Sequence, residues 1–504
     1  MTITDSMLNP TDPWVLLGGG GPPDPYTYVE LDRYYSGSQP LSFLPPDVAQ
    51  MTMGRLRPLL INWPRLVIDS IEERLDVEGF RFGEDLPADS RCWDIWQANN
   101  LDEWSQLCHL EALLHGRSYV LVWADELDNS QPRISVESSQ QMSVVYWPGT
   151  TTIARATKTW VEGDRSFMTV YRPDSIERYI ASSMLAGDSS RTAGAWELRE
   201  EPLSHDLGEV PVVPFVNRPR IARPLGESEL ADVIPLADAV NKLATDMMVT
   251  SEFSASKRRW ATGLEIPRTN DAGERTRFAA EVRQQWDEAT KGKTWLAGPG
   301  VNFGEFTEAS LSNFVAAIEL LTGHIAALSG LPPHYLGLTN NGNPASADAI
   351  RSSEAALVKR AQRKHRVFGG SWERVMRLAL RVQDSVLPDG AMSMETIWRN
   401  PETPTIAQKV DAAVKLDGMG MPFRQNLEDL DYTPTQIDRI LAMRSKDALA
   451  EVAAQMAAAD QIVKDYGVSR AAALSAVGLQ EAASYESKVE KGQPPTPSEL
   501  NVPA

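Results

Sequence analysis

Residues 308–333, EASLSNFVAAIELLTGHIAALSGLPP, carry the clearest structural signal in the chain. Their apolar side chains recur every three or four positions, a spacing that places them along one side of an α-helix. The residues of this stripe are Leu311, Phe314, Ile318, Leu321, Ile325 and Leu328. Gly330 can adopt the left-handed conformation that ends a helix, and the two prolines after it cannot continue one. The stretch therefore predicts an amphipathic helix, within residues 307–330, that has a packing seam and a well-defined end.

A second helix is predicted upstream, within residues 226–261. Its buried side is marked by Leu230, Ile234, Ala237, Val240, Ala244 and Met247. Glu229 and Asp232 suit the positive end of a helix dipole. Pro235 either kinks this helix or lies in its first turn, so the segment from Pro235 to Ala255 is the part predicted to be regular.

Residues 262–306 lie between these two helices and have a different character. They contain short β-prone runs at Leu264–Ile266 and Thr294–Ala297 around a polar helical piece. Two helices of similar length joined by a compact insert predict an antiparallel pair about 30 Å long, with a small α/β head at its far end.

Beyond the second helix, the sequence HYLGLTNNGNPAS at residues 334–346 predicts a loop, and residues 347–388 then predict one long helix. Basic side chains crowd the middle of the long helix, at Lys359, Arg360, Arg363 and Lys364. Such clusters commonly form solvated faces or salt bridges between helices.

The rest of the chain divides into four further parts. Residues 1–25 contain a glycine run followed by prolines and are expected to form a flexible leader. Residues 26–225 begin with helical patterns and continue as β-prone runs, which predicts a mixed body with an antiparallel sheet. Residues 389–484 contain further helices, and residues 485–504 have the composition of a disordered tail. Within the helical part, Thr433 and Gln436 have the spacing of a capping box at the start of a helix over 434–443, and 445–463 is predicted as the next helix.

Composition limits the class of protein. A chain of 504 residues exceeds what one core usually organises, and its net charge of −19 argues against tight, indiscriminate binding of phosphates. The two cysteines, Cys92 and Cys108, can form neither a metal cluster nor a secreted disulfide framework. No apolar run is expected to reach the ~18 residues of a membrane span. We therefore expect a protein of two or more domains with no membrane partner.

The residues that commonly carry catalysis or bind metals form no pattern that predicts an enzyme, a cofactor site or a metal site. Among His109, Glu111 and His115, only the last two share a helix face, so the metalloprotease spacing is absent. Cys108 precedes His109 directly, and neighbours in sequence point in different directions on a helix, which disfavours a nucleophile and base pair.

Two other motifs are incomplete. Residues 291–294, KGKT, match the end of a nucleotide-binding loop, but Asp287 stands where that motif needs a glycine. Residues 465–479 weakly match a helix-turn-helix, for which a plain helical hairpin is the favoured interpretation.

Four strings in a fixed order give the chain its resemblance to a known family. They are LLHGRSYVLVW at Leu113–Trp123, GEVPVVPFVNRPR at Gly208–Arg220, PLGESELADVIPLADAVNKLATDM at Pro224–Met247 and SGLPPHYLGL at Ser329–Leu338. With the helix, insert, helix, loop and long basic helix, they resemble the portal proteins of tailed bacteriophages, in particular the SPP1-portal-like group found in phages of actinobacteria. The resemblance extends from about residue 40 to 445.

This resemblance implies an α+β fold, mainly helical, with the architecture of a portal protein. It implies a wing from 26–225 and the long helix 347–388, and a two-helix stem from 226–261 and 307–330. The stem seam would be Val240, Met247, Leu311, Phe314, Ile318, Leu321 and Ile325. It further implies an α/β clip at 262–306, a tunnel loop at 331–346 and a helical crown at 389–484.

The resemblance also implies partners. We expect a homo-oligomeric ring, commonly of twelve subunits, at one capsid vertex, assembled in the host cytoplasm and binding the terminase large subunit, the head-tail adaptor, and the major capsid and scaffolding proteins. Double-stranded DNA would pass through the ring without sequence specificity, for which an acidic chain is better suited than a basic one. The tunnel loop would contact it through Leu338, Thr339, Asn340, Asn341 and Asn343.

The resemblance also implies a function for two sets of basic residues. Arg268, Arg275, Arg277 and Arg283 of the clip would contact an acidic partner, and Lys359, Arg360, Arg363 and Lys364 would contact acids of neighbouring subunits or DNA phosphates. Two alternatives remain open from the sequence: another capsid-associated structural protein, such as a minor head protein or adaptor without a DNA channel, or an enzyme of unknown chemistry.

Overall fold

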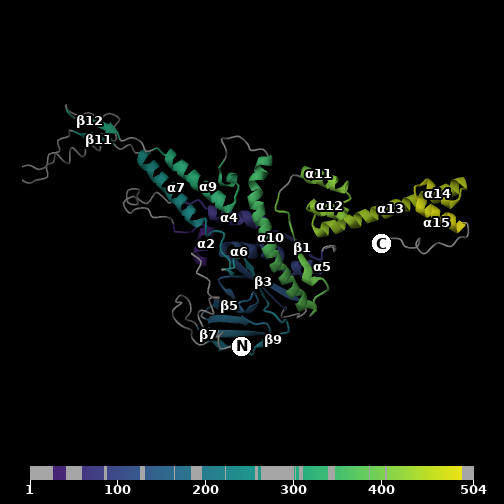
Figure 1. Ribbon diagram of the computed structural model, residues 1–504, viewed down its shortest axis with the longest axis horizontal. Helices are drawn as coiled ribbons and strands as arrows, with labels where there is room; N and C mark the ends of the chain where they lie inside the picture. The colour runs from purple at the N-terminus through teal and green to yellow at the C-terminus, as the bar shows by residue number, and fades with distance from the viewer. Residues whose placement is uncertain are drawn as a thin grey trace, which may run out of the picture. The chain divides into compact units, whose positions relative to one another are not determined.

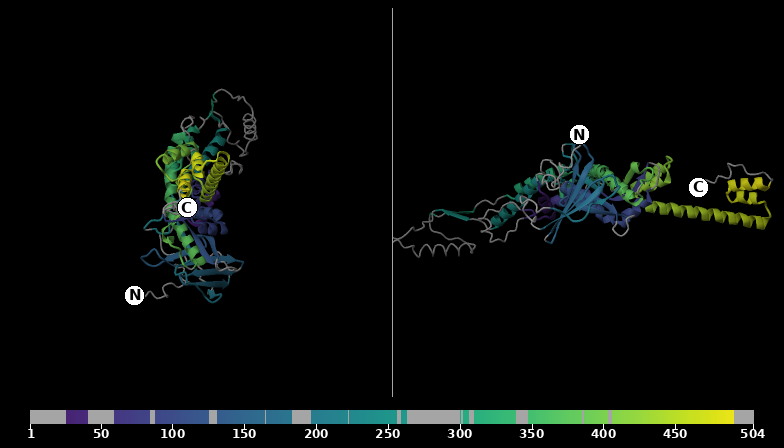
Figure 2. Two further views of the ribbon diagram at one scale, coloured as in Figure 1. Left: turned by 90° about the vertical axis from the view of Figure 1, so that its right-hand side faces the viewer. Right: turned by 90° about the horizontal axis from the view of Figure 1, so that it is seen from below.

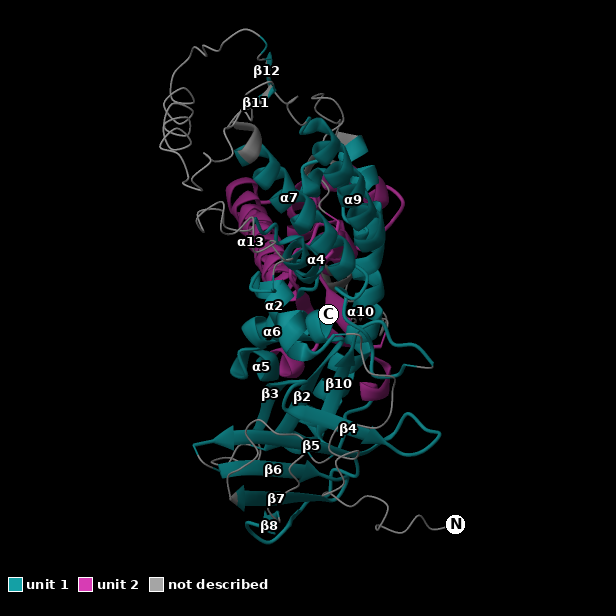
Figure 3. Ribbon diagram, turned by 90° about the vertical axis from the view of Figure 1, so that its left-hand side faces the viewer, with its two compact units in different colours: residues 1–76, 94–389 teal, residues 77–93, 390–504 magenta. Residues whose placement is uncertain are grey.

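The computed structural model of the chain (Figure 1) contains two compact units, drawn in teal and magenta in Figure 3. Unit 1 comprises Met1–Asp76 and Asp94–Asp389, and unit 2 comprises Val77–Trp93 and Gly390–Ala504. The structure describes residues 26–40, 59–83, 88–124, 131–163, 165–182, 196–221, 223–255, 259–262, 300, 302–305, 310–338, 347–384, 386–402 and 406–490.

The centre of unit 1 is a three-stranded antiparallel sheet in the order β10-β2-β3. Helix α6 (Leu101–His115) ends at Gly116, whose φ of 81° turns the chain directly into β2 (Arg117–Ala124). Strand β2 pairs with β3 (Pro132–Ser138) on one side and with β10 (Val212–Val216) on the other. Helices α6 and α10 (Ala347–Asp384) both pack on this sheet. The string Leu113–Trp123 therefore forms a helix end, a turn and the central strand.

Aromatic rings fill the core between the sheet and the two helices. The ring of Phe215 on β10 lies 4.7 Å from that of Trp372 on α10, and the Trp372 ring lies 4.9 Å from that of Trp96 on α5 (Ser90–Ala98). The imidazole of His109 stacks on Phe368 at 5.4 Å. All five side chains are buried. This core holds the middle of the long helix α10 firmly on the sheet.

A second antiparallel sheet completes the mixed part of unit 1. Its strands are β4 (Met142–Tyr146), β5 (Ile153–Glu162), β6 (Arg165–Tyr171), β7 (Ser175–Ser182) and β8 (Glu197–Leu198), with β9 (Leu203–Ser204) also paired to β7. Tyr119 of β2 and Val212 of β10 belong to the same buried cluster as Met142, Val144 and Ile153. The predicted antiparallel sheet is thus present. The sequence interpretation did not include β7, because SIERYIAS mixes charged with apolar residues and lacks a continuous apolar run.

The two predicted helices form an antiparallel pair, α7 (Ile234–Ala255) and α9 (Ser312–Ser329), which lie side by side (Figure 1). Strands β11 (Arg259–Thr262) and β12 (Asn302–Glu305) pair with each other and continue from the far end of the helices. Pro235 lies in the first turn of α7, and Gly330 ends α9 with a φ of 71°, as the sequence predicts. Residues 263–299 lie outside the described part of the chain, and with them lie Arg268, Arg275, Arg277, Arg283 and the KGKT string.

The near end of α7 is attached to two short helices. The Tyr34 hydroxyl of α2 (Tyr28–Ser36) donates to Oδ2 of Asp238 at 2.9 Å. The backbone N–H of Ile61, just before α4 (Trp63–Glu72), donates to Oδ1 of Asn241 at 2.8 Å. Because both acceptors lie in the first half of α7, only that half is fixed to the rest of unit 1 by these bonds.

Unit 2 begins with a strand pair that corrects the predicted division of the chain. Strand β1 (Val77–Phe82) pairs antiparallel with β13 (Met394–Trp398), which follows the short helix η3 (Ala391–Ser393). The prediction assigned residues 77–93 to the mixed body of 26–225, but this pairing groups them with residues 390–504. The strands are separated by most of the chain, so no local pattern reveals their partnership.

The helices of unit 2 are α11 (Ile406–Asp417), α12 (Phe423–Asp429), α13 (Pro434–Tyr466), α14 (Arg470–Ala476) and α15 (Gln480–Glu490). The capping box of Thr433 and Gln436 at the start of α13 is confirmed. The predicted separation into 434–443 and 445–463 is wrong, because α13 is one helix, seen at full length in Figure 2.

The end of unit 2 also differs from the prediction. Helix α15 continues to Glu490, so the proposed tail at 485–504 starts too early, and residues 491–504 lie outside the described part. Ala459 of α13, Ala473 and Leu474 of α14 and Ala483 of α15 form one small buried cluster. Three of these four residues are alanines, whose small side chains allow the three helices to pack closely.

Candidate functional site

The seam of the helix pair is only partly buried in the single chain. Val240 and Ile325 are buried, whereas the remaining seam residues, Met247, Leu311, Phe314, Ile318 and Leu321, are half-buried. Leu328, the last residue of the predicted stripe, is 47% exposed and not packed in the seam. Two further apolar side chains of α9 face solvent, with Val315 46% exposed and Leu320 62% exposed. Only 22% of α9 is buried, although its mean hydropathy is 1.2. The helix pair therefore presents apolar surface that the described residues of this chain do not cover.

The predicted basic cluster of α10 separates into two sets. Lys359 and Arg363 are exposed, Arg360 is half-buried and Lys364 is buried. Arg360 and Lys364 are four residues apart and share the helix face that carries Leu357, Ala361 and Phe368, which are all buried. The cluster consequently consists of an inward pair, Arg360 and Lys364, and an outward pair, Lys359 and Arg363, which differ in their exposure to water.

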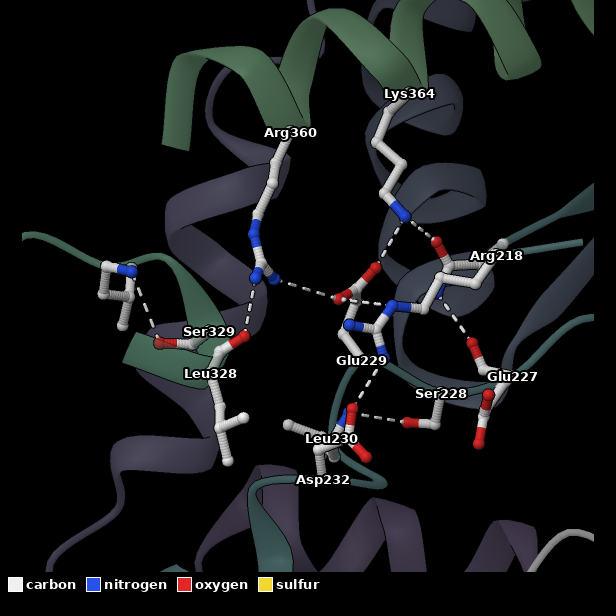
Figure 4. A network of polar contacts seen from close by, with 12 residues as sticks. Arg218, Glu227, Ser228, Glu229, Leu230, Asp232, Leu328, Ser329, Arg360 and Lys364 are labelled. Carbon is white, nitrogen blue, oxygen red and sulfur yellow. Dashed lines mark hydrogen bonds and ion pairs between the residues drawn. The ribbon is translucent and has the colours of Figure 1, made fainter. Parts of the chain in front are cut away.

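The inward pair surrounds one carboxylate, that of Glu229 (Figure 4). The Lys364 ammonium lies 2.5 Å from Oε1 of Glu229, and Nε of Arg218 lies 3.3 Å from Oε2. A guanidinium nitrogen of Arg360 lies 4.0 Å from the same Oε2. Arg218 also forms an ion pair with the exposed Asp232 at 3.2 Å. We call Arg218, Glu229, Arg360 and Lys364 the charge cluster.

The charge cluster is shielded from water, which strengthens its electrostatics. The Glu229 side chain is 2% exposed, and that of Lys364 is 9% exposed. Burial acts to raise the pKa of Glu229, but the charges of Lys364 and Arg218 outweigh burial and hold that pKa below its usual value. Lys364 also donates to the side-chain oxygen of Asn217. Glu229 is therefore an ionised group that compensates three cations at once.

The prediction that Glu229 lies at the positive end of a helix dipole is wrong. Helix α7 begins only at Ile234, and Glu229 lies in the turn before it. The one available signal was the shared face of Arg360 and Lys364 with buried apolar residues, because inward cations require a buried anion.

Backbone contacts hold the segment that carries Glu229. The N–H of Glu229 donates to the carbonyl of Leu113 at 3.0 Å, and the N–H of Glu227 donates to the carbonyl of Asn217 at 3.0 Å. The N–H of Asn217 in turn donates to the carbonyl of Gly116 at 2.8 Å. These residues come from three of the four strings that carry the family resemblance. The strings are thus distant in sequence but meet at one site.

The fourth string, Ser329–Leu338, is attached to the same site. Arg360 donates to the carbonyl of Leu328 at 2.6 Å, at the end of α9 where helix carbonyls lack partners. After the short helix η2 (Pro333–Leu336), the Tyr335 hydroxyl donates to Glu354 of α10 at 3.2 Å and accepts from Arg74 at 3.0 Å. Arg360 therefore connects the charge cluster to the start of the predicted tunnel loop.

The loop itself is only partly described. Leu338 is half-buried, and Gly337 before it has a left-handed φ of 76°. Thr339, Asn340, Asn341 and Asn343 lie outside the described residues, so their contact with DNA stays a prediction.

A second buried charge lies at the end of α6. His115 is 1% exposed, with Nε2 2.7 Å from Oδ1 of Asp32 and Nδ1 2.9 Å from Oε2 of Glu111. Burial acts to lower the pKa of His115, but the hydrogen bond and charge of Glu111, together with Asp32, raise it above the usual 6.5. Glu111 and His115 do share a helix face, as predicted, and they form an ion pair within α6, while the contact between His115 and Asp32 joins α6 to α2.

We predict that His115→Gln destabilises unit 1 in a pH-dependent way. A histidine whose pKa is raised in the folded state stabilises fully below its unfolded pKa, about 6.5. That contribution is lost as pH rises through the folded pKa. The variant is therefore expected to lose about 1–3 kcal/mol at pH 6, and less at pH 9. Chemical denaturation at both pH values measures the difference, with the exposed His324→Gln as control. An equal loss at both pH values would contradict the ion pair.

The remaining candidates for catalytic or metal-binding residues, His109 and Cys108, have structural roles. The Trp372 indole N–H donates to Nε2 of His109 at 2.9 Å, and burial lowers the pKa of His109 to about 3. Cys108 is buried, and burial raises the pKa of its thiol to about 12, which is unsuitable for a nucleophile. Within the described residues, no group of three or more His, Cys, Asp or Glu is arranged to hold a metal.

One carboxylate has a strongly perturbed pKa. Burial, together with the nearby acids Asp76 and Asp69, raises the pKa of Glu72 to about 7. Perturbed groups are typical of active sites. Glu72 lines neither the pocket around Glu78 and Arg81 nor the pocket around Trp160 and Phe167, so the enzyme alternative gains no support from these two pockets.

Comparison with known proteins gives a consistent result. The family model described as "Phage portal protein, SPP1 Gp6-like" matches residues 27–448. The portal protein of Mycobacterium phage D29 is 35% identical over 391 residues, which cover 74% of this chain and 76% of that protein. The portal protein of Mycobacterium phage L5 is 34% identical over 409 residues, covering 77% of this chain and 80% of that protein.

Among solved structures, the chain is similar to one from the neck of a native gene transfer agent (GTA) particle computed with C12 symmetry. The identity is 13% and the TM-score is 0.46, with 82% of this chain and 96% of that chain covered.

Proposed function

We propose that copies of this chain, which belongs to the SPP1 Gp6-like family of phage portal proteins, close into a ring whose axial opening conducts double-stranded DNA. As a portal protein it is a component of the virion. The family argues against the alternative, which is a minor head protein or adaptor without a DNA channel. The observation that supports it best is the uncovered apolar surface of the helix pair.

The apolar surface of α9 needs an explanation. Its length and mean hydropathy of 1.2 make it the one helix, among the described residues, that by length and composition could cross a membrane. The expectation that no apolar run reaches this length is therefore corrected.

A neighbouring protein surface explains α9 better than a bilayer does. Exposed Glu319 and His324 lie on α9 itself, and its partner α7 carries Asp238, Lys242, Asp246 and Glu252. Each charge in the centre of a bilayer costs about 2.5–3.5 kcal/mol or more. At an interface between subunits, the same charges can stay in water at the rim while Val315, Leu320 and Leu328 are covered.

A second copy of the chain is the occupant that gives a closed assembly. If each α7–α9 pair contacts the next pair with a different face, the contact is head-to-tail, and such contacts generate rings when the rotation closes. We propose twelve subunits. The chain's net charge of −19 would keep phosphate binding weak, so that a duplex can slide through the opening.

In this ring α7 and α9 form the stem, and residues 262–306 form the clip that binds the terminase large subunit and later the head-tail adaptor. Residues 26–76 and 94–225 with α10 form the wing that contacts the major capsid and scaffolding proteins, and unit 2 from residue 390 forms the crown. The exposed Lys359 and Arg363 contact acids of a neighbouring subunit or DNA phosphates.

Assembly tests this proposal directly. The purified chain is expected to form rings with a central opening by negative-stain microscopy. Val315→Asp combined with Leu320→Asp should leave single chains, because a carboxylate desolvated in an apolar contact costs several kcal/mol. Val386→Asp, at an apolar residue that is 75% exposed and distant in sequence from the stem, is the control and should still form rings. Rings from the double variant would remove α9 from the interface, and particles without an opening would favour an adaptor.

A further inference from the structure

Unit 1 contains an aromatic groove that the proposed ring, channel and stem do not use. It has a volume of 870 Å³ and is bounded by β2, β4, β5 and β6 together with Tyr28 of α2 and Trp196. The rings of Trp160 and Phe167 stack on each other at 5.3 Å along one wall, and both are only half-buried. Val161 beside them is 56% exposed. An exposed concave surface of this size and composition is typical of a binding site.

The position of Tyr28 indicates what binds there. The chain enters the described region at Tyr26, and Tyr28, two residues later, lines the groove. The residues before it contain one continuous run of large apolar side chains, Trp14-Val15-Leu16-Leu17, followed by the eight residues Gly18–Pro25. Eight residues span at most about 28 Å, enough to return the apolar run to the groove beside Tyr28.

Charge supports the same assignment. Residues 1–25 contain Asp5, Asp12 and Asp24 and no Lys or Arg. The groove is lined by Arg117, and the exposed Arg199 lies over the ring of Phe167 at 5.9 Å. Lys158 does not line the groove, but its ammonium lies 5.6 Å from the centre of the Trp160 ring and is paired with Glu137. Cations at the rim of an aromatic groove favour an apolar segment with acidic flanks.

We propose that Trp14–Leu17 pack into the aromatic groove of their own chain, with Gly18–Pro25 as the tether. While they are bound, the stacked Trp160 and Phe167 are closed to other proteins. A tether of this length gives an effective concentration of about 1 mM, so a segment with an intrinsic Kd of about 0.1 mM is bound about 90% of the time.

Hydroxyl-radical footprinting of the full-length chain tests the proposal, with oxidation of Trp160 and Phe167 measured by mass spectrometry. The variant Trp14→Ser/Leu16→Ser/Leu17→Ser is expected to raise the oxidation of Trp160 and Phe167 roughly tenfold. The reason is that a groove covered about 90% of the time in the parent becomes open all of the time in the variant. The matched control is Ile3→Ser/Met7→Ser/Leu8→Ser, which removes as many apolar residues from the same leader and should change nothing. Trp96, which is fully buried elsewhere in unit 1, reports any loss of folding.

Three results would overturn the proposal. Unchanged oxidation in the first variant means that the leader does not cover the groove. Loss of protection only when residues 183–195 are replaced by a Gly-Ser linker assigns the groove to that segment instead. Protection that disappears on dilution of the unaltered chain assigns it to a second copy. Ring formation is recorded in parallel by microscopy and is expected to persist in both leader variants.

Discussion

Glu229→Gln is expected to lower the free energy of unfolding of the α10 region by about 3–5 kcal/mol, the usual cost of breaking a buried ion pair by removing one partner. The substitution keeps the shape of the side chain but removes the one carboxylate that contacts Lys364, Arg218 and Arg360 together. The buried ammonium of Lys364 is then left with neutral acceptors, the Asn217 side chain and the new amide, and with no compensating negative charge from residue 229. Native-state hydrogen exchange of the α10 amides measures the change.

Asp232→Asn provides the matched control. Asp232 also forms an ion pair with Arg218, at 3.2 Å, but its side chain is 58% exposed. Exposed ion pairs contribute about 0–1 kcal/mol, so this variant should be nearly neutral. Equal effects from the two variants would mean that burial of the charge cluster does not matter.

Acid should diminish the effect of Glu229→Gln. The pKa of Glu229 is lowered in the folded protein, so its contribution is present above the unfolded pKa of about 4.3 and is lost as pH falls through the folded value. The difference between variant and parent should therefore be full at pH 7 and should shrink below about pH 4. A difference that persists unchanged in strong acid would indicate a packing effect of the amide.

Gly226→Ala is expected to destabilise unit 1 by about 2–5 kcal/mol. Gly226 has a φ of +80°, where an alanine costs about 1–2 kcal/mol, and overpacking adds about 1–3 kcal/mol. A Cβ there would lie 2.4 Å from the backbone oxygens of both Asn217 and Gly116. Neither carbonyl can move freely, because each accepts a backbone hydrogen bond. Denaturant unfolding followed by circular dichroism measures the loss.

Gly208→Ala separates the two contributions. Gly208 has a similar φ of +70°, but a Cβ there meets nothing within 4 Å. Only the conformational cost of about 1–2 kcal/mol is expected. If both alanine variants lose the same stability, the close approach at Gly226 has no energetic weight.

Both predictions concern the place where the four strings of the family resemblance converge. Gly116, Asn217, Gly226 and Glu229 form its backbone and its charge, and Arg360 extends it to the end of α9. A displacement of α9 against α10 would have to break the hydrogen bond from Arg360 to Leu328. The charge cluster is therefore the attachment point through which the helix pair and the start of the loop are held on the long helix.

The sequence by itself determined the features that depend on neighbours within a turn or two. The three-and-four spacing from Leu311 to Ile325 placed α9, Gly330 and the prolines after it ended that helix, and Thr433 with Gln436 started α13. Local geometry decides these features, because the interacting groups are close in the chain. The order of the four strings was also sufficient to recognise the family.

Only the tertiary structure decided which distant residues meet. Strand β1 finds β13 across more than 300 residues, an interval in which no periodicity carries information about the partner. The basic residues of α10 looked like one cluster in sequence, yet Arg360 and Lys364 turn inward to Glu229 while Lys359 and Arg363 face water. A buried charge requires a partner of opposite sign wherever the fold can supply one, and its identity depends on packing between elements far apart in the chain.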